Sequence, residues 1–393
     1  MATATGTSAL LSEAALRERV ERWAAIEHGS ASPGERAVAN MLADELRGLG
    51  LDVRIEEERV HGTYWWPIGI PTALAALAGL AGRTLGVVTG LFAAKAVADD
   101  MHCRNQWLRR LFLPKRTTYN VVAELGPADA ARTVVFVAHH DAPHSGLVFH
   151  PELPRAWARR MPWLLARVNT SAPTMWGAFY GPLALALGSL FGWRRLRAGG
   201  TLLSAGYAAA MADIGLRRVV PGANDNLSGV AAQMSVATAL AANPPPDLRV
   251  ILLFPGSEES FQEGMQGWGH RHFPELPRET TTFVNFETVG SPHLFVMEGE
   301  GMLGIYEYSK DLLALIKELA DERGIYLVPE LRTRNSSDGL IALNAGFRTA
   351  TFCSVDEFKA PTNYHWPTDI PDNLNYATVA DCARLCLALT ERL

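Results

Sequence analysis

Cysteine is scarce in this sequence, with four residues in a chain of 393. Cys382 and Cys386 lie four positions apart on the apolar face of the expected last helix, a spacing typical of core packing. Cys103 and Cys353 stand apart from this pair and from each other. The cysteines therefore exclude a disulfide framework and a zinc knuckle.

A large excess of charge of either sign is also missing, since the formal net charge is −5. A chain so close to balance implies no extended surface for a polyanion, and we expect no nucleic acid as a partner. The segment from Met1 to Leu11 lacks a basic region followed by an apolar core, so we expect no secretory signal.

The chain is long enough to bury a substantial core, as one large α/β domain or as two. Its last part alternates strand-like and helix-like segments, which predicts a mostly parallel sheet with helices on both faces and sites at the carboxyl ends of the strands. The segments are Leu248–Phe254 (strand), Glu263–Phe273 (helix), Thr281–Phe286 (strand), Leu294–Met297 (strand), Leu312–Glu322 (helix), Ser337–Leu343 (helix), Thr349–Cys353 (strand) and Tyr376–Leu389 (helix).

The turn from Pro221 to Gly229 carries one acid, Asp225, and opens into the apolar run Val230 to Leu240. Asp and Asn are common at turns and helix N-caps for local hydrogen-bonding reasons, so capping explains this turn when it is taken alone. A carboxylate on such a turn can also reach two partners at once, as a metal-bridging ligand must. The other ligand-type residues of the chain favour the second interpretation.

His139 and Asp141 follow the strand-like run from Thr133 to Ala138, and their side chains are expected on the same side of the chain. A metal-bound imidazole needs its other nitrogen held by an acceptor, usually a carboxylate. We therefore predict His139 as a metal ligand and Asp141 as the residue that orients it. His140 and His144 are expected to be structural or to face the substrate.

Two acids, Glu258 and Glu259, follow the strand-like run that ends at Phe254. Adjacent acids are usually a solvated pair, but at a strand end one can bind metal while the other moves protons. Glu287, which closes the next strand-like run, and His365 are further ligand candidates.

These marks resemble the co-catalytic di-zinc aminopeptidase family, which includes relatives of secreted bacterial leucyl aminopeptidase, glutamate carboxypeptidase, glutaminyl cyclase and the catalytically inactive transferrin receptor. The resemblance implies a three-layer α/β/α fold of zinc exopeptidase type with a mostly parallel mixed central sheet. The matching segments, in the family's order, are Ala138-His139-His140-Asp141, Gly222 to Gly229, Ser257-Glu258-Glu259, Asn285-Phe286-Glu287 and Tyr364-His365 with Asp369.

The resemblance also implies a role for each residue, including two Zn²⁺ ions bridged by Asp225 and a cis peptide after that residue. One zinc is held by Asp225, Glu259 and His365 and the other by His139, Asp225 and Glu287, while Glu258 is the general base and Tyr364 steadies the oxyanion. Charge supports two metals independently, because three carboxylates and a bridging hydroxide balance two zinc ions, whereas three clustered carboxylates alone would repel each other.

Two positions depart from the family pattern. Glu287 stands where these aminopeptidases more often carry Asp, which lengthens the side chain that reaches the second zinc. Ser337-Asp338-Gly339 resembles a Ser-Asp-His stretch that lines the substrate cleft, but the His is missing. The preferred N-terminal residue of a substrate is therefore not implied by the resemblance.

Two regions consist of long uncharged runs, and each predicts a pair of apolar helices joined by a basic tip. They are Tyr64 to Gly82 with Thr84 to Ala94, around Arg83, and Val168 to Trp193 with Ala198 to Ala212, around Arg194, Arg195 and Arg197. We predict a catalytic domain formed by residues 1–62, 100–160 and 217–393, with apolar helical insertions at 63–99 and 161–216.

A helix that spans a bilayer needs roughly 20 apolar residues, and the first run of each region meets this length. The functional interpretation is membrane association through residues 64–98 and 168–216. Because basic residues flanking the insertions outnumber those at the tips, the catalytic domain would then face the cytoplasm. The alternative is a soluble cytoplasmic enzyme on which these regions form an apolar lid or a dimer surface.

The sequence as a whole predicts a zinc-dependent exopeptidase, in the first place a metallo-aminopeptidase that removes N-terminal residues from peptides. The alternatives are a glutaminyl cyclase-like acyl transferase, a branch that the resemblance associates with one zinc, and a non-catalytic receptor-like relative. The oligomeric state and the biological substrate are not indicated by the sequence.

Overall fold

The computed structural model describes residues 11–103 and 105–393. Residues 1–10, on which the expectation of no secretory signal rests, and Arg104, one of the basic residues that flank the insertions, lie outside the described residues.

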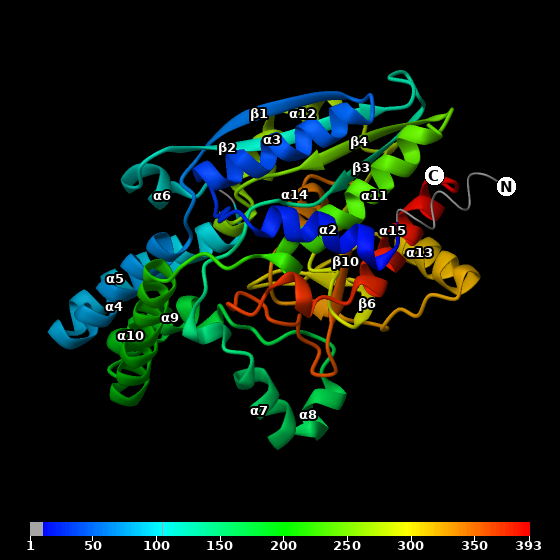
Figure 1. The fold of residues 1–393 in the computed structure, drawn as a ribbon. Coiled ribbons are helices and arrows are strands. Elements are labelled where there is room, and N and C mark those ends of the chain that lie inside the picture. Colours follow the sequence, from blue (N-terminus) through cyan, green and yellow to red (C-terminus); the bar gives the residue numbers. More distant parts are fainter. Residues whose placement is uncertain (1–10, 104) are drawn as a thin grey trace.

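A seven-stranded mixed sheet forms the centre of the molecule (Figure 1). Its four middle strands run parallel, and the outer pairings are antiparallel. Because the middle strands point the same way, their carboxyl ends meet at one edge of the sheet. In spatial order the strands are β1 (Asp52–Val60), β2 (Arg116–Leu125), β4 (Leu248–Phe254), β3 (Arg132–Val137), β5 (Thr281–Phe286), β10 (Arg348–Val355) and β6 (His293–Val296).

Helices cover both faces of the sheet, because the central strands are apolar on both sides and are buried. One face carries α2 (Glu13–Ala24), α3 (Pro33–Gly48), α11 (Ser228–Ala242), α13 (Lys310–Arg323) and α15 (Tyr376–Thr390) over the larger core. The other face carries α12 (Glu263–His272) and α14 (Asp338–Asn344) over a second core. The predicted three-layer α/β/α fold is confirmed, and Cys382 and Cys386 lie in the core as expected.

Smaller elements surround this centre. A three-stranded sheet contains β7 (Gly299–Glu300), β8 (Tyr306–Glu307) and β9 (Arg332–Thr333), and the short helices are α6 (Trp107–Phe112), α7 (Glu152–Arg160) and α8 (Pro162–Arg167).

The two apolar regions form helical hairpins that pack on each other and project from the sheet domain (Figure 1). We call them together the four-helix unit, which comprises α4 (Trp65–Ala81), α5 (Arg83–Met101), α9 (Trp176–Phe191) and α10 (Arg194–Leu216). Sharp turns at Gly82 and Gly192, both with positive φ, separate the helices of each hairpin. The division of the chain into catalytic segments and insertions stays a prediction.

Within residues 11–103 and 105–393, no helix has both the length and the apolar character needed to cross a membrane. The first uncharged runs form helices of 17 and 16 residues, because both helices end at their glycine turns and the second begins only at Trp176. The expected membrane-spanning helices, and the cytoplasmic orientation that depended on them, therefore gain no support.

Candidate metal centre

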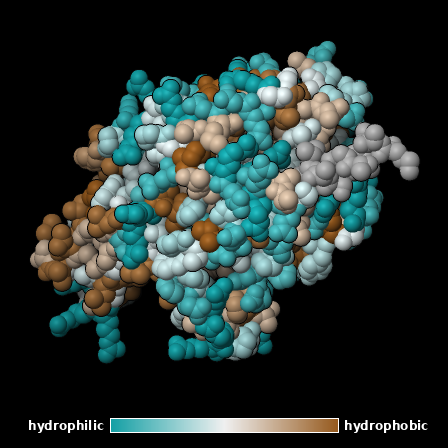
Figure 2. Space-filling model, in the orientation of Figure 1, coloured by the Kyte–Doolittle hydropathy of each residue, from teal (hydrophilic) through white to brown (hydrophobic). Residues whose placement is uncertain are grey.

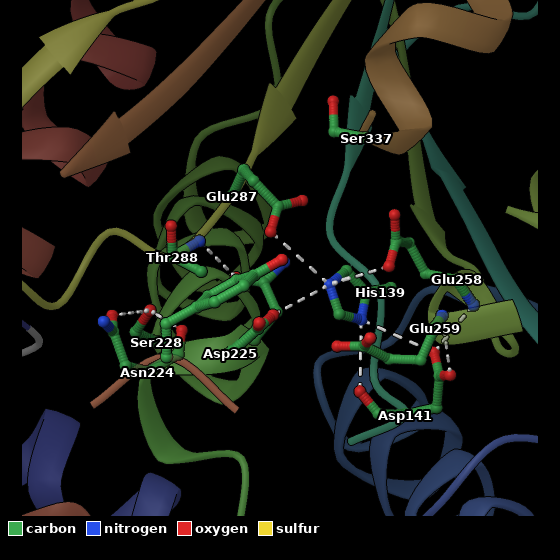
Figure 3. Close-up of polar contacts among 12 residues, drawn as sticks. His139, Asp141, Asn224, Asp225, Ser228, Glu258, Glu259, Glu287, Thr288 and Ser337 are labelled. Atoms are coloured by element: carbon green, nitrogen blue, oxygen red, sulfur yellow. Dashed lines mark hydrogen bonds and ion pairs between the residues drawn. The ribbon is translucent and has the colours of Figure 1, made fainter. Parts of the chain in front are cut away.

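Ligand-type side chains from several loops converge beyond the carboxyl edge of the sheet (Figure 3). His139 and Asp141 follow β3, Glu258 and Glu259 follow β4, and Glu287 directly follows β5. The Asp225 turn precedes α11, and His365 lies between β10 and α15, so the chain brings the sequence-predicted ligands together from five places. The predicted metal ligands among these side chains are His139, Asp225, Glu259, Glu287 and His365.

Asp225 lies between the two histidines and contacts each with a different oxygen. Its Oδ1 is 3.4 Å from His139 Nε2, and its Oδ2 is 3.2 Å from His365 Nε2. All three side chains are buried. This arrangement, with one carboxylate oxygen for each of two imidazoles, is the geometry that a bridging ligand requires.

The other acids complete two groups of atoms around this bridge. His365 Nε2 is 3.4 Å from Glu259 Oε2, and His139 Nε2 is 3.8 Å from Glu287 Oε1. Ligand atoms on a tetrahedral zinc at about 2.0–2.1 Å are separated by roughly 3.3 Å, which is close to these spacings. His139, Asp225 and Glu259 also offer ligand atoms within 4.8 Å of one another.

Several of these buried atoms have no hydrogen-bond partner among the described residues. They include Nε2 of His139, Nε2 of His365, Oδ1 of Asp225 and Oε2 of Glu287. Buried polar atoms without partners are costly and rare in folded proteins, so a cluster of them calls for an explanation. A donor set of imidazoles and carboxylates at these spacings fits zinc.

Burial and mutual repulsion shape the electrostatics of the cluster. Burial raises the pKa of Glu258 and Glu259 well above the usual range, and it raises that of Glu287 as well. Burial acts in the same direction on Asp225, but the adjacent imidazoles of His139 and His365 outweigh it and bring the pKa to about 2. Closely spaced acids of this kind are stabilised by positive charge among them.

Burial and neighbouring charges shift the pKa of His139 in the opposite directions from those in which they shift the pKa of Asp225. Burial lowers its pKa, whereas the charge of Glu258 and contacts with other acids raise it, and the net pKa lies well above the ordinary value. Its Nδ1 faces the backbone carbonyl of Asp141 at 3.1 Å and the Asp141 carboxylate at 3.4 Å. Nε2 is thereby directed at the acids.

Asp141 also fixes the loop that carries the two adjacent glutamates. Its carboxylate accepts hydrogen bonds from the backbone N–H groups of Glu258 and Glu259, at 2.9 and 3.2 Å, and from the hydroxyl of Ser30 at 2.6 Å. The predicted role of Asp141 as an orienter of His139 is therefore accompanied by a second contact set that the sequence did not indicate.

The turn around Asp225 is held by side chains from distant loops. The Asp369 carboxylate accepts hydrogen bonds from the backbone N–H groups of Asn224 and Asp225. The Asn226 side chain donates to the carbonyl of Phe286 and accepts from the N–H of Thr288, and these two residues flank Glu287. The peptide bond between Asp225 and Asn226 is cis, as the resemblance implied. Asn226 thus ties the Asp225 turn to the loop of Glu287, a contact that the sequence analysis missed.

Glu258 is distinguished from Glu259 by its surroundings. Its Oε1 accepts a hydrogen bond from Gln262 Nε2 at 2.6 Å, and its Oε2 lies 3.9 Å from His139 Nε2. Glu258 and Glu259 both line a pocket that opens beside the cluster. The pocket is also lined by Asp225, Glu287, Glu300, Tyr364 and the apolar side chains Phe295, Met297, Leu331 and Val355.

The aromatic and histidine candidates take separate positions. Tyr364 stacks on His365, with ring centroids 3.9 Å apart, and lines the pocket. His140 is fully buried, and burial lowers its pKa to about 4, which is consistent with a structural residue. His144 packs against Trp65 at the base of the four-helix unit, with ring centroids 4.4 Å apart.

Gly339 stands where the resembling family carries His, and its surroundings explain the difference. A Cβ atom at this position would lie 2.3 Å from Thr351 Oγ1 and 2.8 Å from the Tyr308 hydroxyl. Tyr308 also hydrogen-bonds Glu300, whose pKa burial raises to about 7. No larger residue fits here without displacing this buried network.

Arg109 supports the loop that carries Glu258 and Glu259. It pairs with Asp100 at 2.6 Å and with Glu263 at 3.3 Å, and it donates to the carbonyl of Ser260 at 2.6 Å. The side chain is fully buried. The loop it supports has positive φ at Ser257 and Phe261, a backbone conformation that costs free energy and needs such support.

Arg109→Met is therefore expected to lower the free energy of unfolding by about 3–5 kcal/mol, because it leaves two buried carboxylates without their cation. Chemical denaturation measures the change. Arg110→Met is the matched control, since Arg110 is exposed on the same helix and should change stability by less than about 0.5 kcal/mol. Equal effects of the two substitutions would contradict the assigned role of Arg109.

The mixed sheet and its helical layers define the fold class of the zinc exopeptidases. The family model described as peptidase family M28 matches residues 208–390, which include all predicted ligands except His139. The resemblance recognised in the sequence motifs is confirmed by this match.

Individual proteins of known sequence or structure are also similar to this chain. An aminopeptidase from Pseudomonas aeruginosa is 35% identical over 83 residues, which cover 21% of this chain and 15% of that protein. A zinc-dependent exopeptidase structure from Parabacteroides distasonis has a TM-score of 0.58 at 13% identity, over 97% of this chain and 98% of the other. A glutaminyl cyclase from Tannerella forsythia has a TM-score of 0.59 at 14% identity, over 98% and 99%. At these identities the structural likeness shows the fold.

Proposed function

We propose that the protein is a zinc-dependent metallo-aminopeptidase that hydrolyses N-terminal residues from peptides. The observation that carries the proposal is the pair of histidines facing opposite oxygens of Asp225, with Glu259 and Glu287 beside them. Two metal sites that share one carboxylate suit hydrolysis of an acyl bond. The family match of residues 208–390 supports the same reaction class.

Two Zn²⁺ ions are assigned to the cluster, as the sequence implied. Asp225, Glu259 and His365 are proposed for one ion and His139, Asp225 and Glu287 for the other. The unpartnered ligand atoms support this division, because they belong to both groups. When bound, zinc lowers the pKa of a coordinated water and polarises the scissile carbonyl.

The protein's own side chains are proposed to transfer protons and to position the reacting groups. Glu258 is proposed to take the proton of the attacking water and to pass it to the leaving amine, since its carboxylate borders both the pocket and the ligand cluster. Tyr364, whose side chain lines the same pocket, is proposed to steady the tetrahedral oxyanion. Asp141 keeps His139 and the Glu258 loop in position.

Glutaminyl cyclase-like chemistry is the alternative, because structures with that activity share this fold. The two reactions differ in their products: an aminopeptidase releases a free amino acid, whereas a cyclase releases ammonia from an N-terminal glutamine. Ammonia release without free amino acid would replace the proposed function with the alternative.

Metal removal tests the proposed function directly. A panel of aminoacyl-chromogenic substrates should be hydrolysed by the purified protein, and dialysis against a chelator should reduce the rate to that of the uncatalysed reaction. Metal analysis should find about two zinc ions per chain, and added zinc should restore the activity. Hydrolysis that is untouched by chelation would contradict the metal mechanism.

A further inference from the structure

The four-helix unit has its large apolar side chains on the outside. Leu80 on α4 is 79% exposed, and Leu202 on α10 is 73% exposed. The other two helices follow the same pattern, with Leu85, Val88 and Leu91 exposed on α5 and Leu190 and Phe191 on α9. Figure 2 shows apolar residues gathered over this projecting part of the molecule.

Away from its base, the inside of the unit consists mainly of small residues, with Leu185 as a buried exception. A Cβ atom at Gly200 would lie 2.3 Å from the backbone nitrogen of Leu185, and one at Gly90 would lie 2.6 Å from the carbonyl oxygen of Pro182. A Cβ atom at Gly79 would likewise lie too close to the side chain of Thr201. The helices therefore approach closely through glycine, serine, threonine and alanine, as helices do when their surroundings are as apolar as leucine.

This distribution is the reverse of that of a water-exposed bundle, in which leucine fills the interior and polar residues face outward. An exposed apolar surface of this extent marks a contact with an apolar partner. Large apolar side chains are exposed on all four helices, whereas a two-fold contact with a second copy uses one patch. The partner must therefore surround the unit.

The distribution of charged residues in the four-helix unit further limits the kind of partner that fits its surface. Residues 60–98 and 168–212 contain no Asp or Glu, and of their few cations Arg83, Arg194, Arg195 and Arg197 lie at the tip and Lys95 lies in the second half of α5. Arg194 and Arg195 are exposed at the tip, and Arg83 donates to the carbonyls of Ser189 and Leu190 there. Lys95 and Arg110 are exposed at the base. An uncharged belt between basic ends matches hydrocarbon bordered by anionic headgroups.

We propose that the four-helix unit embeds its apolar belt in a lipid bilayer that contains anionic phospholipid. The proposed contact is with the outer surface that the four helices share, and no helix among the described residues is by itself long and apolar enough to cross a membrane. The proposal concerns a surface separate from the metal cluster and does not depend on the proposed peptidase activity.

The base of the unit connects it to the catalytic loop. Tyr64 stacks on Phe261, with ring centroids 5.1 Å apart, and Phe261 lies two residues after Glu259. Trp65, Met211 and Met302 belong to the same apolar cluster. The pocket is thereby held at a fixed position relative to the proposed lipid surface.

Vesicle flotation with the full-length protein tests the proposal. Protein purified in detergent is mixed with vesicles of phosphatidylcholine, with or without an anionic phospholipid, and the detergent is removed. We expect the protein to float with both kinds of vesicle and to partition more strongly into the anionic ones. Leu80→Gln/Leu202→Gln should reduce the partition coefficient at least tenfold, whereas Tyr306→Gln/Tyr326→Gln, two exposed aromatics outside the unit, should not change it.

Zinc content and hydrolysis of a soluble aminoacyl substrate are measured on the same samples. Both should be unchanged in Leu80→Gln/Leu202→Gln, so a failure of the lipid proposal is distinguishable from a failure of the proposed function. Protein that stays in the lipid-free fraction would overturn the proposal. A concentration-dependent dimer without affinity for vesicles would also overturn it and assign the surface to a second copy.

Discussion

Replacing Glu258 with glutamine is expected to reduce kcat by about 10²–10⁴-fold, the range for loss of a positioned general base. Glutamine keeps the shape of the side chain but cannot accept a proton. Because the residue is not among the proposed ligands, KM and the zinc content should change little. Steady-state kinetics on an aminoacyl substrate, together with metal analysis of the same preparation, measures both quantities.

Glu259→Gln is the informative comparison, since the two acids are adjacent and chemically identical. Glu259 Oε2 faces His365 Nε2, so its substitution should lower bound zinc, and excess zinc should restore part of the activity. If Glu258→Gln is the variant that loses zinc, the two roles are reversed. If both variants keep full activity, the active site lies elsewhere.

The sequence predicted that most of these side chains converge, because His139, Glu258, Glu259 and Glu287 follow buried strands and Asp225 lies on a tight turn. Parallel strands end at one edge, so a residue after β3, a pair after β4 and one after β5 must converge even when they are far apart in the chain. The fold class followed from the same alternation. Neither inference needed knowledge of side-chain contacts.

Contacts between distant side chains were not predictable in this way. Arg109 lies among basic residues that look solvent-exposed in the sequence, but it is buried between Asp100 and Glu263. Asn226 was noted only as part of a motif, although it joins the Asp225 turn to the Glu287 loop. Such pairings depend on three-dimensional packing and leave no spacing signal.

The apolar regions show a different limit. Uncharged runs indicated apolar helices, but not that the two hairpins pack on each other mainly through small residues and leave most of their leucines outside. Hydropathy along the chain records how much apolar surface exists and not which way it faces. The direction of Leu80 and Leu202 had to come from the structure.

Replacing Asp225 with asparagine is expected to have the largest effect on metal binding, because its two oxygens contact the two histidines. Asparagine keeps the shape but loses the charge and presents only one oxygen, so it cannot bridge two cations. Bound zinc should fall from about two ions to fewer than one per chain, and activity should fall to background. Glu287→Gln, which affects one site, should leave about one ion.

Asp338→Asn is the matched control for this substitution. Asp338 is fully buried like Asp225, and neither of its oxygens has a hydrogen-bond partner among the described residues, but it is not in the ligand cluster. The change replaces a buried carboxyl group with an amide in the same region, so its zinc content should stay at the wild-type value. Asp225→Asn with two bound zinc ions, or equal zinc loss in the two variants, would exclude Asp225 as the bridge and require a different pairing of ligands around His139 and His365.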